Sequence, residues 1–316
     1  MFVLDCNLAE PKSKFCKPAD LDRLFVAVDG LTGGKKRDKA LERAEFLQCL
    51  VRMAVLKYVQ PKIMTDVSEA YERLLVEDIE PHLGPAIFAH PNVFREECYA
   101  QSVDAVLKAN EDSLRSLFGA IARVGRTPAT KPLGPMLTLG EWKTLCKRLM
   151  LFDIDLTDRD CNMCFVNSRM AVIDGQSERG KPKEAAIPFE GFCECLCRVA
   201  CLKALPTAEE MAASSTPEEP CPDAGLFFLN MHDPKLVTLF REANAVPWGG
   251  TPRMPIAECV QGLLSMILRT IETTVSSEKG GKGFLSDLKI TAEEMQSWCE
   301  LVGWERKEEK MNTSLD

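Results

Sequence analysis

The sequence lacks the features of membrane and secreted proteins. No run of about 18 uncharged apolar residues occurs, and the longest candidate, 192–205, contains Glu194, Arg198 and Lys203. The N-terminal stretch "MFVLDCNLAEPKSK" has neither a basic region nor a long apolar region, so it does not resemble a secretory signal. We therefore expect a cytoplasmic protein without a membrane partner.

Recognisable catalytic motifs are also missing. The chain contains no GxSxG, HExxH or kinase-type loop, and its three histidines do not have the spacing of a metal-binding helix. The stretch "GLTGGKKR" does not fit a phosphate-binding loop, because only three residues separate Gly30 from Gly34 and Lys36 replaces the required Ser or Thr. We expect a non-catalytic protein.

Excess positive charge is absent as well. The net charge is −8, whereas proteins that bind nucleic acids or anionic membranes carry basic surfaces. The basic runs "GGKKRDK" and "RGKPK" are short and contain no aromatic residues, which is typical of solvated loops. We expect no nucleic-acid partner.

Cysteine, in contrast, is abundant, with 14 residues. A chain without a secretory signal is expected to keep its thiols reduced in the cytosol. A reduced cysteine behaves as a small apolar residue, so we expect most of them in helix cores.

Helical periodicity dominates the chain and strand-like alternation is almost absent, which predicts an all-α fold. The predicted helices span 19–28, 42–59, 66–80, 92–108, 111–124, 138–151, 157–172, 189–204, 233–244, 256–277 and 291–302.

Four of the joints between a loop and a helix share one pattern, an apolar residue followed by a position for a carboxylate and then by an aromatic residue or thiol. They read "LERAEF" (41–46), "LTLGEW" (137–142), "IPFEGF" (187–192) and "MPIAEC" (254–259), and each follows a long loop and an amphipathic helix. This arrangement resembles the EF-hand family of the calmodulin superfamily. The resemblance implies EF-hand-like helix-loop-helix repeats with extra covering helices.

The resemblance also assigns roles to two sets of residues. The apolar residues Leu41, Leu137, Ile187 and Met254 would pair across short two-stranded links between hands. The position that clasps calcium would be occupied by Glu45, Glu141, Gly191 and Glu258.

The loops themselves argue against calcium, which needs six to eight oxygen ligands. Counting back from Glu45 places Lys36 at a ligand position, and counting back from Glu141 reaches Pro132. We expect degenerate hands without a cofactor, in which Glu45, Glu141 and Glu258 stabilise helix N-termini. Calcium binding at these three glutamates remains the alternative.

Two groups of cysteines suggest a zinc site as a second alternative. The candidate ligands are Cys161 and Cys164 of a CxxC motif together with Cys193 and Cys197. The helical phase favours packing instead, because Cys195, Leu196 and Val199 follow Phe192 at core spacing, and Cys193, Cys197 and Cys201 form a second stripe. We expect a helix that is buried on two sides.

The predicted organisation has five parts. They are a first hand with two covering helices (1–110), a paired domain (111–205), a linker (206–225), a C-terminal hand-like unit (226–305) and a disordered tail (306–316).

The expected function is that of an intracellular protein-binding scaffold. In the EF-hand superfamily a groove between paired hands accepts an amphipathic helix, and the walls would here be Met53, Leu149, Met150, Val199 and Met266. Hands of this long-loop kind look similar to those of cytoskeletal and ciliary proteins in protists, which favours a cytoskeletal partner and a cytoskeletal or ciliary location. A calcium sensor and a zinc-stabilised helical protein are the alternatives.

Overall fold

The computed structural model describes residues 2–29, 41, 43–83, 91–122, 131–173, 177, 180–279 and 288–304. The chain divides into two compact units, Met1–Phe88 (unit 1) and Ala89–Asp316 (unit 2). Helices dominate both units, and within the described residues the regular strands form one two-stranded sheet. The all-α prediction is confirmed. No helix in this part of the chain is both long and apolar enough to cross a membrane.

Unit 1 is built around two helices that share a core. Its elements are α1 (Phe2–Asp5), α2 (Pro18–Val28), α3 (Arg43–Ala54), the π-helical turn η1 (Val55–Val59), α4 (Val67–Arg73), the π-helical turn η2 (Leu74–Ile79) and the 3₁₀ turn η3 (Glu80–His82). Proline begins α2, where a missing amide hydrogen costs nothing. Leu21 and Leu24 of α2 share a buried cluster with Leu50 and Met53 of α3.

A polar contact links η1 and η2 beside this core. The buried Lys57 ammonium group donates to Asp78 at 2.9 Å and lies 3.5 Å from the Glu10 carboxylate. The hydroxyl of Tyr58 donates to the same Asp78. Burial and this hydrogen bond raise the pKa of Tyr58. Lys57 is therefore held by two carboxylates where the helices meet.

Unit 2 begins with helices that lead into a pair of helix-loop-helix segments. Their elements are α5 (Pro91–Cys98), α6 (Gln101–Ala109), α7 (Glu111–Ile121), the 3₁₀ turn η5 (Lys131–Leu133), β1 (Leu137–Thr138), α8 (Leu139–Arg148), α9 (Asp158–Asn167), α10 (Gly180–Ala185), β2 (Ala186–Ile187) and α11 (Phe189–Leu202). Capping boxes begin α8 at Thr138 and α9 at Thr157, since each threonine caps the third helical residue and that residue caps the threonine.

The two segments are joined by a short antiparallel link. Leu137 of β1 pairs with Ile187 of β2, the two residues that the sequence pattern places opposite each other. The residues that follow also meet, because Trp142 and Phe192 contact edge to face with their ring centroids 6.2 Å apart. The indole N–H of Trp142 donates to the carbonyl of Cys161 at 3.1 Å, so that it ties α8 to α9.

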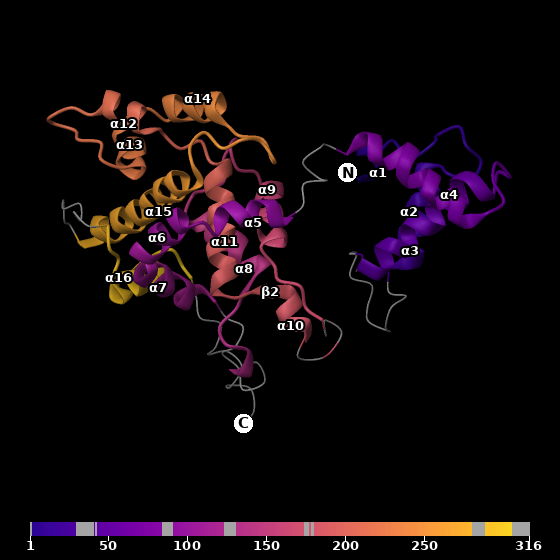
Figure 1. Ribbon diagram of the computed structural model, residues 1–316, viewed down its shortest axis with the longest axis horizontal. Coiled ribbons are helices and arrows are strands. Elements are labelled where there is room, and N and C mark those ends of the chain that lie inside the picture. Colours follow the sequence, from indigo (N-terminus) through magenta and orange to yellow (C-terminus); the bar gives the residue numbers. More distant parts are fainter. Residues whose placement is uncertain are drawn as a thin grey trace. The chain divides into compact units, whose positions relative to one another are not determined.

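The remaining helices of unit 2 gather around α15. They are α12 (Ala208–Ser214), α13 (Ala224–Asn230), α14 (Pro234–Asn244), α15 (Ile256–Lys279) and α16 (Ala292–Leu301). α15 packs against α11, α13, α6 and α16. Figure 1 shows α11 in the middle of unit 2, with α15 on one side and α9 on the other.

This organisation differs from the predicted division of the chain. The boundary falls at residue 88 rather than 110, because Cys98 and Val103 belong to the core of unit 2. Residues 226–305 lie in the same unit as 111–205, because α15 packs on α11. The predicted linker, 206–225, contains α12 and leads into α13, which packs on α15. The predicted tail, 306–316, lies outside the described residues.

Helix α11 is buried on every side, which confirms the prediction of a helix buried on two faces. Every residue from Gly191 to Leu202 is buried, including two charged residues. The carboxylate of Glu194 accepts hydrogen bonds from Arg95 at 3.0 Å, Tyr99 at 2.8 Å and Arg198 at 2.6 Å. These three donors compensate the loss of water around the buried charge.

Candidate functional site

The predicted calcium-clasp residues have different surroundings. Glu45 is buried in α3, and Glu258 lies exposed in the first turn of α15. Glu141 accepts hydrogen bonds from the amide and the hydroxyl group of Thr138 at 2.8 and 3.0 Å, so its carboxylate caps α8. The first predicted loop, 30–40, lies outside the described residues.

Gly191, at the third clasp position, packs so closely against its neighbours that a side chain there would be crowded. A Cβ atom on this residue would lie 3.0 Å from the Cβ of Ile187 and 3.2 Å from the carbonyl oxygen of Ser168. The start of α11 therefore packs directly against β2 and the end of α9. A carboxylate at this position would displace that contact.

Two of the four zinc candidates interact with different thiols, and neither of these thiols is another candidate. Burial and the neighbouring Cys161 thiol raise the pKa of Cys146, whereas the Cys98 thiol raises the pKa of Cys197. Cys164 is fully buried in α9. Cys193 is buried in α11, on the face that also carries Cys197 and Cys201. Across the described ranges, no group of three or more His, Cys, Asp or Glu side chains converges in a way that could hold a metal ion.

The buried thiols are poor nucleophiles. All 14 cysteines are free and buried. Burial raises the pKa of Cys193 to about 12 and, more strongly, raises that of Cys195. Cys259 differs, because a hydrogen bond from Cys201 lowers its pKa. Since the thiolate is the reactive form, most of these cysteines act as packing residues.

The predicted groove walls need a correction. Met53, Leu149, Val199 and Met266 are all buried in helix cores, and only Met150 is exposed, at 68%. Leu149, Val199 and Met266 belong to one cluster, because α15 lies against α11 where a partner helix was expected. The groove of the paired segment is thus filled by the chain itself.

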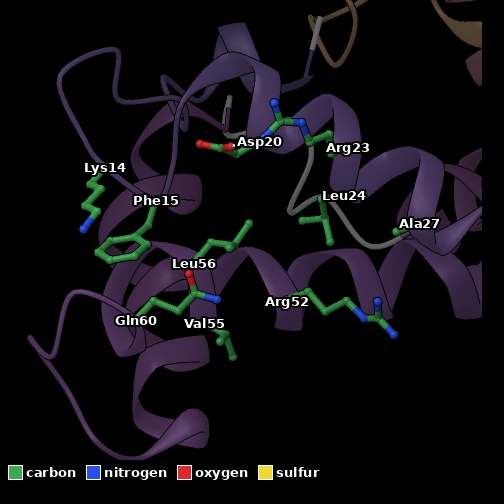
Figure 2. Close-up of a pocket in the computed structure, with 10 residues that line it drawn as sticks. All are labelled: Lys14, Phe15, Asp20, Arg23, Leu24, Ala27, Arg52, Val55, Leu56 and Gln60. Carbon is green, nitrogen blue, oxygen red and sulfur yellow. Dashed lines mark hydrogen bonds and ion pairs between the residues drawn. The ribbon is translucent and has the colours of Figure 1, made fainter.

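An open groove exists instead in unit 1. It lies between α2 and the α3–η1 helix and has a volume of about 570 Å³. It is lined by Lys14, Phe15, Asp20, Arg23, Leu24, Ala27, Arg52, Val55, Leu56 and Gln60. Figure 2 shows Leu24 and Leu56 pointing toward each other into the space between the helices, with Phe15 at one end. We call this space the α2–α3 groove.

The rim of the α2–α3 groove is charged. Arg23 donates to Asp20 at 3.2 Å, and the Lys14 ammonium group lies 5.6 Å from the centroid of the Phe15 ring. Arg52 is exposed on the opposite helix. The groove therefore combines an apolar floor with cationic edges, which suits a peptide better than a metal ion or a reaction centre.

A second cavity of unit 1 is polar. It has a volume of about 700 Å³ and is lined in part by Glu10, Lys57, Glu77, Asp78 and His82. Its most buried cation, Lys57, is already held by Asp78 and Glu10. The cavity thus combines paired charges with apolar residues such as Pro11, Pro61 and Ile63.

Sequence reasoning missed the α2–α3 groove. The sequence pattern assigns the predicted helices at 19–28 and 42–59 to the first hand-like unit. The rim cations Lys14, Arg23 and Arg52 come from three separate segments and share no local motif. The available signal was an N-terminal helix pair without a second pair beside it in sequence, with an arginine on each of its two helices.

Comparisons with known proteins found no match to this chain among protein-family models, curated protein sequences or solved structures.

Proposed function

We propose that this chain is a non-catalytic protein-binding module built from degenerate EF-hand-like helix pairs, and that its α2–α3 groove receives a helix of a partner protein. A cytoskeletal protein is the partner class that the sequence resemblance favours. The observation that carries the proposal is the open apolar groove in unit 1. In unit 2, by contrast, α15 covers the corresponding surface of α11.

The pairing of the two helix-loop-helix segments in unit 2 supports the hand-like interpretation. Leu137 pairs with Ile187 in the antiparallel link, and Trp142 meets Phe192 directly after it. Both contacts join equivalent positions of the repeated pattern. Gly191 supports the degenerate character, because this clasp position has no carboxylate and even a Cβ atom there would be crowded by Ile187 and Ser168.

The difference between a covered apolar surface in unit 2 and an open one in unit 1 supports binding of a partner by unit 1. In unit 2, Val199 of α11 and Leu263 of α15 belong to the same buried cluster. In unit 1, α4 packs on α3 and η1, while the side between α2 and α3 stays open. Apolar surface of this kind is typical of interaction sites.

The proposal is tested with a photo-crosslinking residue placed at Gln60, which lines the groove, and with the same residue at Val76, which is exposed in unit 1 but does not line it. We expect one protein to crosslink from position 60 in native cells and not from position 76. That product should disappear when Leu56→Asp is added to the chain. Equal labelling from both positions would refute the proposed groove.

A metal titration separates this function from the two alternatives. If the hands are structural, the melting temperature and the fluorescence of Trp142 should not change between a chelator and millimolar calcium. A calcium-dependent shift would favour the sensor, and stoichiometric zinc in the purified protein would favour the zinc-stabilised fold.

A further inference from the structure

The rim of the α2–α3 groove carries positive charge on a chain that is acidic overall. Three cationic side chains, Lys14, Arg23 and Arg52, line the groove together with one carboxylate, Asp20. The whole chain has a net charge of −8. The positive rim is therefore a local feature and does not follow from the composition.

The single carboxylate of the rim is already engaged. Asp20 accepts a hydrogen bond from the Lys17 amide at 3.0 Å and another from Arg23 at 3.2 Å. It thus helps to begin α2 and gives the groove little negative character of its own.

The cations, in contrast, keep hydrogen-bonding capacity. The side chain of Arg23 is 80% exposed and uses one nitrogen for Asp20, although a guanidinium group has five N–H donors. Arg52 is exposed, and no ion pair joins it to another residue in the described part of the chain. Lys14 makes a cation–π contact with Phe15. All three can pair with carboxylates of a bound molecule.

The positions of the cations favour an elongated ligand. Figure 2 shows Lys14 at the end of the groove marked by Phe15 and Arg52 toward the end marked by Ala27, with Arg23 on the opposite helix. Cations that are spread along a groove do not form a clamp for a single phosphate group. They match carboxylates that are distributed along one peptide.

The floor of the groove matches the apolar face of a helix. Phe15, Leu24 and Leu56 form an apolar strip along the groove. A helix that binds such a strip presents apolar residues at positions i, i+3 or i+4, and i+7. Its flanking positions then face the rim.

From these observations we propose that the occupant of the α2–α3 groove is an acidic amphipathic helix, with apolar residues against Leu24 and Leu56 and carboxylates against Lys14, Arg23 and Arg52. This inference rests on the proposed protein-binding function and adds the charge of the partner.

The test uses three synthetic helical peptides with the same leucine face. Their flanking residues are all glutamate, all glutamine or all lysine, and binding to the full chain is measured by fluorescence anisotropy. We expect the glutamate peptide to bind about tenfold more tightly than the glutamine peptide, since each of three exposed ion pairs adds a small contribution. Raising the ionic strength should reduce this preference.

Charge reversal provides the matched control. In the variant Arg23→Glu/Arg52→Glu the preference should change to the lysine peptide. The variant Lys62→Glu/Arg159→Glu makes the same change in net charge at exposed positions outside the groove and should keep the preference for glutamate.

The outcomes distinguish this inference from the function on which it rests. Equal binding of the three peptides that is lost in Leu56→Asp would overturn the acidic partner while retaining the groove. A preference for lysine in the unmodified chain would also overturn it. Absence of binding by all three peptides, together with no groove-specific crosslink from Gln60, would refute both proposals.

Discussion

The Lys203 ammonium group lies 2.6 Å from the Asp155 carboxylate, and their side chains are 1% and 0% exposed. Lys203 also donates to the carbonyl of Leu151 at 3.0 Å, and Asp155 accepts from the amide of Ala204 at 2.9 Å. Burial lowers the pKa of Lys203 despite its partner. This pair connects the end of α11 to the turn between α8 and α9.

Removing one member of this pair should be more harmful than removing both. Lys203→Met leaves the Asp155 carboxylate buried without a counter-charge, for which we expect a loss of about 3–5 kcal/mol in the free energy of unfolding. The double variant Lys203→Met/Asp155→Leu should recover most of that loss. Urea unfolding followed by tryptophan fluorescence measures the effect in unit 2, because all four tryptophans lie there. If the loss in the double variant equalled the sum of the losses in the two single variants, the expectation would be contradicted.

The ionisation of Tyr99 should report on the buried carboxylate of Glu194. Burial and the hydrogen bond to Glu194 raise the pKa of Tyr99 to about 12. Glu194→Gln removes the negative charge that accepts the hydrogen bond, so the pKa of Tyr99 should fall toward its ordinary value. Ultraviolet titration with Tyr99→Phe as the reference isolates this residue. Glu190→Gln, at an exposed position one turn earlier in α11, should leave it unchanged.

Substitution of Gly191 should destabilise unit 2 by steric contact alone. Gly191→Ala forces a shift of β2 or of the end of α9, and we expect a cost of about 1–3 kcal/mol. Gly140→Ala is the matched control, because a Cβ atom there meets nothing within 4 Å on an exposed helix. That change should stabilise the protein by up to about 1 kcal/mol. Equal effects of the two substitutions would show that the close packing of Gly191 is unimportant.

Alkaline pH should weaken unit 2 through its buried thiols. The pKa of Cys193 is raised from the ordinary 9.0 to about 12 in the folded chain. The unfolded chain therefore loses this proton first, and the stabilisation is complete below pH 9 and decreases as the pH rises toward 12. Between these two pKa values, one such thiol lowers the free energy of unfolding by about 1.4 kcal/mol for each pH unit.

Cys193→Ala should reduce that slope by the contribution of one thiol. Urea unfolding at several pH values, followed by tryptophan fluorescence, measures it. Cys6→Ala lies in unit 1 and should leave the slope of unit 2 unchanged. An unchanged slope in Cys193→Ala would contradict the expectation.

Much of the fold could be predicted because its signals are local. The helix predicted at 189–204 is observed as Phe189–Leu202, and the one at 256–277 as Ile256–Lys279. Apolar periodicity locates such helices, and a Thr-x-x-Glu pattern, Thr291 with Glu294, marks the start of α16. The contact of Leu137 with Ile187 agrees with the pairing that the resemblance to EF-hands implied.

The remaining features depend on contacts between distant segments. The helix predicted at 92–108 is interrupted at Tyr99 and Ala100, where neither glycine nor proline occurs. The hydrogen bond from Tyr99 to Glu194 forms beside this interruption, across 95 residues of sequence. Several helices have apolar faces of similar size, so periodicity does not decide that α15 covers α11. For the same reason, apolar periodicity does not show which helix faces of unit 1 remain uncovered, so it did not predict the α2–α3 groove.

The complete burial of α11 has a consequence for how unit 2 can be divided. Because α11 contacts α9 and α15, both its N-terminal and its C-terminal neighbours in sequence contribute to one core. A fragment that ends at Leu205 would expose Val199 and the thiol of Cys201 to water. Unit 2 should therefore melt in a single cooperative transition, and its slowest-exchanging amide hydrogens should lie in α11. The smallest soluble fragment that contains the paired segments must extend through α15.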